Sequence, residues 1–412
     1  MGENTVLAGF QVRDAANHGV TASNVDNVEL RNNLIENSGG SGVFLDDVGG
    51  NAILFDNEIN GSADRGVFIQ NTQTDRSIEV AIAGFDLDSN RVGMEFVAAG
   101  SDTEFPSQRI VVGPSTDANT SVGTPNGTAL TNSVLNSTDE GIIVQATGAS
   151  LFSSVTQEFS LSEATINNSG AAGLQLIAET GAHSQEFNIT DSEISDGGGN
   201  GIEVISGQPP AGPTASASAQ EFVVRDSLIS NNAGNGIDIT LSDAGAQELV
   251  IRGNQIVANS GDGIRSLAEN VVVQEWRTDE ETGDAGISEN IISGNGNQAI
   301  VIELTDLAVM PINSIVDNDL SDNGVGSDIE ITSTSTPGTS AAACLIIEDN
   351  LAPLGIQLTG ADPILTGNVP SVLVQDLPSL VADPDVTFLS DFFGFTTVST
   401  APFNNATNRC IP

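Results

Sequence analysis

Carboxylates are the side chains of this sequence best suited to chemistry. Asp279, Glu280, Glu281 and Asp284 stand in one short segment, beside the single tryptophan, Trp276. Hard cations such as Ca²⁺ bind several carboxylate and carbonyl oxygens at once. These four residues are therefore a candidate Ca²⁺ site, and Ca²⁺ is the one candidate cofactor. The segment matches neither an EF-hand loop nor the Gly-Gly-x-Gly-x-Asp repeat of Ca²⁺-binding β-rolls.

Groups for acid–base or nucleophilic catalysis are few. Asp46 and Asp47 form a carboxylate pair, but separation and burial decide whether two carboxylates can hydrolyse a glycoside, and the sequence gives neither. His18 and His183 are the two histidines, and both fall where we expect solvated surface residues. Lysine and tyrosine are absent. The sequence therefore assigns no catalytic residue, and it favours a protein that is not an enzyme.

The charge of the chain is strongly negative. The 412 residues contain 55 acidic and 11 basic side chains, which gives a net charge of −44. Nucleic-acid phosphates and anionic membrane surfaces both need basic contacts, so this balance argues against either partner. No apolar run approaches the 18 or so residues of a membrane-spanning helix, and we expect no membrane insertion. The many carboxylates of the chain repel one another, and salt weakens this repulsion. Such a protein therefore suits a saline or Ca²⁺-containing exterior.

A repeat determines which elements carry these side chains. An aliphatic anchor is followed eight positions later by a second aliphatic residue, which in most copies has a glycine just before it, as in Ile35 and Val43. Successive anchors are 23 to 47 residues apart, which indicates a solenoid with outward loops of variable length. The apolar residues around each anchor alternate with period two, which is typical of strands. The repeat therefore predicts an all-β fold, a right-handed parallel β-helix of three sheets and about eleven coils.

Stacking equivalent positions predicts columns of like side chains. Phe159, Phe187, Phe222 and Leu249 are expected to stack inside, and Glu158, Glu186, Glu221 and Glu248 outside. Arg225 and Arg252 occupy one position in adjacent coils, and we expect them to face outward toward carboxylates. Three residues after the anchor, an amide column is predicted whose members are Asn232, Asn259, Asn295 and Asn323. Serines hold the same position in earlier coils and are expected to bridge coils less well: Ser38, Ser62, Ser137 and Ser169.

These repeats resemble the pectate-lyase-like superfamily of right-handed β-helix proteins, and Asn32 to Leu45 is a good example of its repeat. The resemblance covers roughly Asn4 to Thr332 and implies the fold rather than an activity, because that scaffold carries lyases, hydrolases, epimerases, adhesins and fibres. The lyase relatives use Ca²⁺ on clustered aspartates with an Arg base, and the hydrolase and epimerase relatives need Gly-His-Gly or tyrosine motifs. These motifs do not occur here.

Two domains are predicted: the β-helix over residues 1–340 and a C-terminal cap segment over 341–412, where the repeat spacing breaks down. Cys344 and Cys410 bracket this segment and are expected to form a disulfide in an oxidising compartment. The loop that they would close has about 66 residues, and closing it stabilises the fold by about 4 kcal/mol. The segment is loosely similar to terminal segments of secreted bacterial β-helix surface proteins. The alternative is two unpaired, buried thiols.

The sequence favours a non-enzymatic structural or adhesive β-helix that is extracellular or on the cell surface. Met1 runs directly into the first strand, which leads us to expect removed upstream sequence or a cap supplied by another molecule. An uncapped first coil also makes end-to-end self-association into filaments an expected partnership. Two alternatives stay open: a carbohydrate-active enzyme, either a polysaccharide lyase or a hydrolase, and a glycan-binding module in which Trp276 stacks on a sugar.

Overall fold

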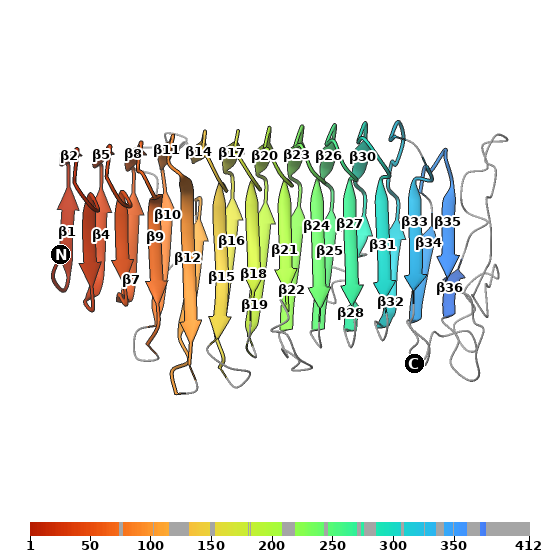
Figure 1. Cartoon of the computed structure of the whole chain (residues 1–412), viewed down its shortest axis with the longest axis horizontal. Coiled ribbons are helices and arrows are strands. Elements are labelled where there is room, and N and C mark those ends of the chain that lie inside the picture. Colours follow the sequence, from red (N-terminus) through yellow and green to blue (C-terminus); the bar gives the residue numbers. More distant parts are fainter. Residues whose placement is uncertain are drawn as a thin grey trace. The chain divides into compact units, whose positions relative to one another are not determined.

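The computed structural model divides the chain into two compact units, Met1–Ile205 (unit 1) and Ser206–Pro412 (unit 2). It describes residues 1–73, 77–101, 103–114, 132–148, 153–179, 181, 183–207, 219–242, 246–269, 273–275, 286–305, 309–324, 326–334, 342–348, 350–360 and 371–375. Every described element is a strand, as predicted, and the strands lie side by side within each unit (Figure 1).

Unit 1 is built from three parallel sheets, which we call A, B and C, and each coil of the chain adds one strand to each of them. Sheet A contains β1 (Thr5–Ala8), β4 (Asp26–Arg31), β7 (Gly49–Phe55), β10 (Ile78–Ala83), β13 (Ser107–Val112), β16 (Thr156–Ser162) and β19 (Ser184–Thr190). Sheet B contains β2 (Gln11–Arg13), β5 (Leu34–Glu36), β8 (Glu58–Asn60), β11 (Asp86–Asp88), β14 (Ser133–Leu135), β17 (Thr165–Asn167) and β20 (Glu193–Ser195). Sheet C contains β3 (Val20–Ser23), β6 (Val43–Asp46), β9 (Arg65–Asn71), β12 (Val92–Gly100), β15 (Ile142–Gly148), β18 (Leu174–Ala178) and β21 (Ile202–Ser206).

Unit 2 repeats this plan. Its sheet A contains β22 (Ala219–Arg225), β25 (Ala246–Arg252), β28 (Val273–Glu275), β29 (Ile287–Ser288), β32 (Val309–Val316), β34 (Ala342–Glu348) and β36 (Ser371–Gln375). Its sheet B contains β23 (Leu228–Ser230), β26 (Gln255–Val257) and β30 (Ile291–Ser293), continued by single bridges at Asp319 and Leu351. Its sheet C contains β24 (Ile237–Ser242), β27 (Ile264–Glu269), β31 (Ile300–Thr305), β33 (Ile329–Thr334) and β35 (Ile356–Gly360).

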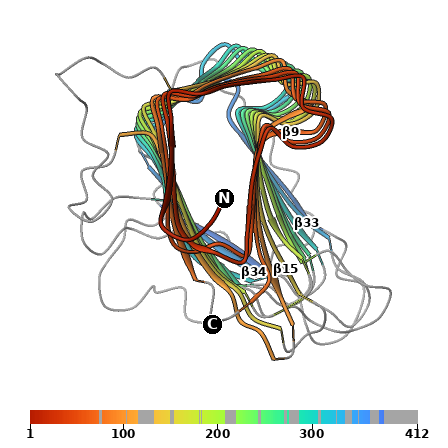
Figure 2. The same ribbon diagram turned by 90° about the vertical axis from the view of Figure 1, so that its left-hand side faces the viewer.

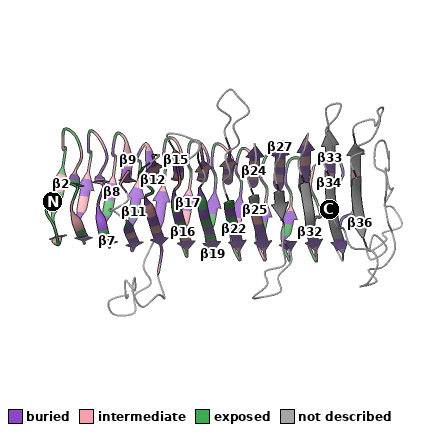
Figure 3. Ribbon diagram, turned by 90° about the horizontal axis from the view of Figure 1, so that it is seen from below, coloured by how far each residue is buried: buried purple, intermediate pink, exposed green. Residues whose placement is uncertain are grey.

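Each unit is a right-handed parallel β-helix, as the repeat predicted. Figure 2 views the coils end-on, and the coils of each unit have three sides around an interior. The anchors of unit 1 pair in one column of sheet B, where Val12 faces Ile35 and Ile35 faces Ile59. The second aliphatic positions pair likewise in sheet C, where Val43 faces Val67. Burial alternates along the strands (Figure 3), because neighbouring side chains of a strand point to opposite faces.

The predicted internal stack is confirmed within both units. Phe159 pairs with Phe187, and Phe222 with Leu249, and all four side chains are at most 1% exposed. The predicted outer columns also pair in register, Glu158 with Glu186 and Arg225 with Arg252.

The predicted amide column is confirmed in unit 2. The side-chain Nδ2 of Asn232 donates to Oδ1 of Asn259 (2.9 Å), and that of Asn259 donates to Oδ1 of Asn295 (3.0 Å). Each Oδ1 also accepts the backbone N–H of the preceding column residue, so every rung joins two coils twice. In unit 1 the serines of this position are buried, and their hydroxyls have no hydrogen-bond partner among the described residues. Asn90 is the exception there, since it accepts from the Ser62 N–H and donates to Ile59 O.

Two further amide columns were not predicted. One lies two residues before the anchor and runs through Asn254, Asn290, Asn318 and Asn350 in unit 2, with side-chain bonds of 2.8 to 3.0 Å. The other is a glutamine column in sheet A of unit 1, where Gln185 donates to Gln157 and Gln157 to Gln108, both at 2.9 Å. Buried amides that satisfy one another leave few unpaired polar atoms inside a narrow core.

Parallel pairing in unit 2 extends past residue 340. β34 pairs with β32, β35 with β33, and β36 with β34. The segment predicted as a cap therefore begins with strands in β-helix register. Residues 376–412, which form most of that segment, lie outside the described residues.

Candidate functional site

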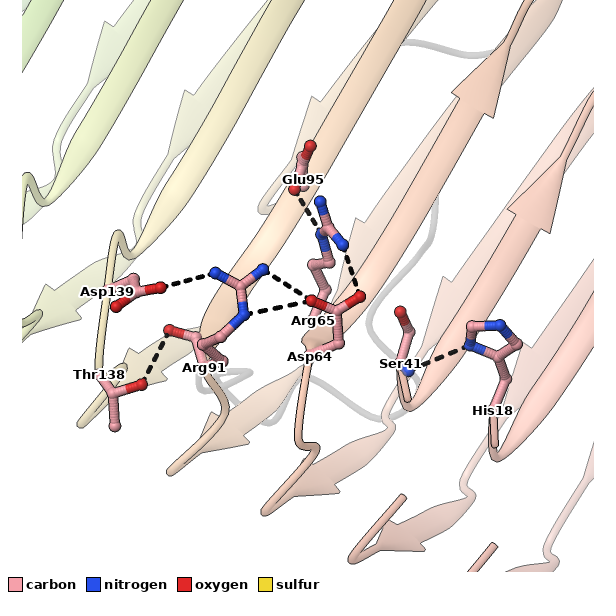
Figure 4. A network of polar contacts seen from close by, with 8 residues as sticks. All are labelled: His18, Ser41, Asp64, Arg65, Arg91, Glu95, Thr138 and Asp139. Atoms are coloured by element: carbon pink, nitrogen blue, oxygen red, sulfur yellow. Dashed lines mark hydrogen bonds and ion pairs between the residues drawn. The ribbon is translucent and has the colours of Figure 1, made fainter. Parts of the chain in front are cut away.

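A cluster of partnered charges in unit 1 lies where the turns from sheet B enter sheet C. It contains Asp64 and Arg65 at the start of β9, Arg91 just before β12, Glu95 on β12 and Asp139 in the turn before β15 (Figure 4). Partners that bond to one another within this cluster are up to 48 positions apart in sequence. Parallel register brings them together, because the turns before β9, β12 and β15 occupy equivalent places in successive coils. We call these five residues the coil-bridging network.

Arg65 links two coils through its guanidinium. Its Nε lies 2.5 Å from Oε2 of Glu95, and its Nη1 lies 2.5 Å from Oδ2 of Asp64. The guanidinium carbon also sits 4.6 Å from the centre of the Phe68 ring, in a cation–π arrangement. Glu95 is 7% exposed, so its charge is largely removed from water and depends on Arg65 for compensation.

Arg91 links the next pair of coils. Its Nη2 lies 2.6 Å from Oδ1 of Asp64, and its Nη1 lies 2.6 Å from Oδ2 of Asp139. The Asp64 carboxylate thus accepts hydrogen bonds from the guanidiniums of both Arg65 and Arg91 (Figure 4). Burial alone would raise the pKa of Asp64, but the hydrogen bonds from Arg91 and Arg65 outweigh it and lower that pKa. Asp64 is therefore held as a carboxylate by its neighbours.

An aromatic stack continues this face toward the first coil. The rings of Phe44 and Phe68 are stacked with centroids 5.2 Å apart, and the imidazole of His18 lies 4.7 Å from Phe44. Nδ1 of His18 accepts the backbone N–H of Ser41 at 3.1 Å. His18 is half-buried, so the prediction of a solvated residue was wrong: its ring packs on the outer face of sheet C. Phe68 is thus in contact with the Phe44 ring and with the Arg65 guanidinium.

Other described arginines have the same role as those of the network. Arg109 of β13 lies 2.7 Å from Glu79 on one side and 3.2 Å from Glu158 on the other, so it compensates one member of the stacked glutamates. In unit 2, Arg265 lies 3.0 Å from Glu303 and 3.6 Å from Asp238. These partners stand on adjacent strands of one sheet. The chemistry of this arrangement is attraction between neighbouring coils.

The predicted site residues are placed as follows. Asp279, Glu280, Glu281, Asp284 and Trp276 lie outside the described residues. Within the described part of the chain, no three His, Cys, Asp or Glu side chains gather as metal ligands would. Cys344 belongs to β34, and Cys410 lies outside the described residues, so the disulfide stays a prediction.

The two carboxylates of the pair Asp46–Asp47 lie in different surroundings. Asp47 is buried and accepts the Thr72 N–H at 2.6 Å and Nε2 of Gln73 at 3.0 Å. Asp46 faces outward on β6, where burial and then the nearby Asp47 charge raise its pKa. Asp47 thus anchors the segment that follows β9.

His183 corrects a second prediction. It was expected in a solvated loop, but it is 2% exposed and stands just before β19. A Cβ on Gly181 would lie 2.5 Å from Cε1 of His183, which shows how closely the turn packs on the imidazole. The length of the turn between sheets C and A, which varies from coil to coil, concealed this from the sequence.

The sequence alone did not identify the coil-bridging network. One usable signal existed: opposite charges at equivalent positions of consecutive repeats, as in Asp64, Arg91 and Asp139, each a few residues before a strand of sheet C.

Comparison with known proteins supports the fold. A family model described as "Right handed beta helix region" matches residues 1–83 of the 412. No curated protein and no solved structure matches the chain. Among the described residues there is also no helix with the length and hydropathy needed to cross a bilayer.

Proposed function

We propose that the chain is a non-enzymatic structural or adhesive β-helix of the extracellular space or cell surface, whose copies associate end to end. The observation that carries this proposal is that the arginines form ion pairs between neighbouring coils. Six of those described bridge neighbouring coils through carboxylates, namely Arg13, Arg65, Arg91, Arg109, Arg252 and Arg265.

This pattern favours a mechanical role. Exposed ion pairs contribute little singly, about 0–1 kcal/mol each, but here each pair joins adjacent coils of a solenoid whose stability depends on nearest-neighbour contacts. Glycan enzymes and lectins use charged and aromatic side chains on free surfaces, whereas Arg65, Phe44 and Phe68 already contact one another or their neighbours. An acidic exterior suits a saline medium, which supports the extracellular placement.

A turnover assay tests the non-enzymatic part of the proposal. The purified chain is incubated with neutral and uronate polysaccharides, with and without Ca²⁺, and new reducing ends and unsaturated products are measured. We expect none above buffer. If a substrate is cut, Arg91→Gln distinguishes the roles: a catalytic arginine would lose turnover, whereas a bridging one loses only stability. Cutting of any substrate contradicts the proposal, and saturable binding without cutting indicates the glycan-binding alternative.

End-to-end association needs its own test. Sedimentation velocity and negative-stain electron microscopy are carried out over a hundredfold range of protein concentration, in low salt and in 1 M NaCl with Ca²⁺. We expect assemblies that lengthen with concentration at high salt, because screening removes the repulsion between acidic copies. A single species under all conditions would contradict end-to-end association while leaving the non-enzymatic assignment intact.

A further inference from the structure

A glycine precedes sheet C in most coils because its neighbour in the next coil leaves no room for a side chain. A Cβ on Gly42 would lie 2.3 Å from Cγ2 of the next anchor, Ile59, and one on Gly263 would lie 2.2 Å from Cγ2 of Ile292. Such distances are sterically forbidden. Each coil therefore keeps a hydrogen atom where the next coil presents an anchor methyl group.

Asp328 breaks this rule in unit 2. It directly precedes β33, whose Ile329 pairs with Ile300, so it holds the glycine position of its coil. Asp319 bridges Leu351 in the following coil, which places Ala352 opposite the anchor Leu320. The small Ala352 thus stands where other coils have a larger aliphatic anchor, and it leaves space for the Asp328 side chain.

That side chain is fully buried and only partly satisfied. Asp328 is 0% exposed. Its Oδ2 accepts the Leu354 N–H at 2.6 Å, and its own N–H donates to Gly355 O at 2.9 Å. Its Oδ1 has no hydrogen-bond partner within the part of the chain that the structure describes, and the same holds for the adjacent Ser327 hydroxyl. A buried carboxylate with one unpaired oxygen disfavours the charged form.

The described residues around Asp328 supply no compensating charge. The titratable side chains on the packed elements are Asp319 and Asp322 in the same turn, Glu303 on β31 and Glu330 on β33, all of them acidic. The opposing segment, residues 350–360, has no charged residue. Burial raises the pKa of Asp328 to about 6, although backbone hydrogen bonds from Leu354 and Gly355 act to lower it.

We propose that Asp328 makes the attachment of residues 350–360 to the preceding coil proton-dependent, firmer when the carboxyl is neutral and looser when it is charged. The pKa is higher with the segment docked than with it open, so docking binds a proton. The stabilisation is then fully present below about pH 4 and is lost as the pH rises through about 6. The proposal concerns local opening and is independent of the proposed function.

Hydrogen exchange by mass spectrometry tests the proposal on the full chain at pH 5.0 and 7.5, after correction for intrinsic exchange rates. In the natural protein we expect the opening equilibrium constant of peptides covering 350–360 to rise about tenfold between the two values. Asp328→Asn should remove this rise, because the amide is uncharged at both pH values. Asp322→Asn is the matched control: that carboxylate is exposed, stands in the same turn, and has a positive φ that asparagine tolerates. It should keep the rise.

A second variant keeps the test valid if Asp328→Asn does not fold. Asp328→Gly introduces the residue that most other coils have at this position, and it should also abolish the pH dependence, whatever the asparagine variant does to folding. Equal protection at both pH values in the natural protein would overturn the proposal. So would an undiminished pH dependence in Asp328→Gly.

Discussion

At the residue scale, the polar side chains inside the coils decide how well one coil holds the next. Asn259 is nine-tenths or more buried, yet its amide bonds to Asn232, Asn295 and a backbone carbonyl, so its desolvation is offset. A serine at the same position is too short to reach across. Ser62 is buried, and its hydroxyl has no partner among the described residues. Unit 1 therefore holds its coils together less strongly at this column than unit 2.

This difference can be tested by extending the column from Asn90. The amide introduced by Ser62→Asn should donate to Oδ1 of Asn90, as Asn259 does to Asn295, and raise the free energy of unfolding by about 1 kcal/mol. Gly42 already leaves the space, as Gly236 does beside Asn259. The matched variant Ser62→Ala should change stability very little. Urea unfolding followed by circular dichroism measures both, and a clear loss in Ser62→Ala would show that the hydroxyl is bonded after all.

Part of this pattern of buried amides and ion pairs could be predicted from the sequence. The Asn232 column was predicted because its members recur at a fixed distance from the anchor. The Asn254 column was missed because Ala164, Ser192 and Ser227 interrupt the equivalent place in other coils. The Arg91–Asp139 pair was missed for a different reason: the partners are 48 residues apart, and they stand at equivalent positions only when the chain is compared repeat by repeat.

At the element scale, most strands of sheet C begin at or beside a glycine that lies against the anchor of the next coil. The strands themselves were predictable from alternating hydrophobicity and from turn residues. Many of these turns place Asn or Asp in the left-handed region, for instance Asn37 (φ 55°) and Asp56 (φ 56°), which these two residue types tolerate better than most. This need explains much of the Asn and Asp content independently of any binding site.

The glycine contact gives a sharp prediction for the elements. In Gly42→Ala, the new methyl group would meet Cγ2 of Ile59 and the carbonyl oxygen of Gly66, at 2.3 and 2.8 Å in the unrelaxed structure. Strands β6 and β9 must then separate, and we expect unit 1 to lose about 2–3 kcal/mol of stability. Gly2→Ala is the control, since its nearest contact would be Thr5 Oγ1 at 3.7 Å. Equal unfolding midpoints for the two variants would contradict this account.

At the scale of the whole molecule, repulsion between carboxylates opposes folding. With 55 acidic side chains and 11 arginines, the coil-bridging pairs can compensate only a minority of the negative charges. Composition alone was enough to predict this imbalance. The placement of the arginines between coils required the structure, because a count of charges does not say which residues lie opposite one another in adjacent coils.

The melting temperature should therefore rise with salt. Between 0.01 and 1 M NaCl the screening length falls from about 30 to about 3 Å, which weakens long-range repulsion more than the short ion pairs. Circular dichroism melts over this range test the expectation. Repeating the series at pH 4, where many carboxylates are neutral, should shrink the effect. A melting temperature that falls with salt would instead make the ion pairs the dominant electrostatic contribution.

The contact between each glycine and the anchor of the following coil also bears on how such a chain can evolve. A larger side chain at one place is accommodated where its counterpart one turn further along is smaller, as Asp328 and Ala352 illustrate. Substitutions in descendants of this sequence should thus appear as coupled pairs offset by one turn. The unit that evolves together is then the contact between two successive repeats, rather than one repeat. Recombination at a point between the two contacting residues would separate partners that must change together.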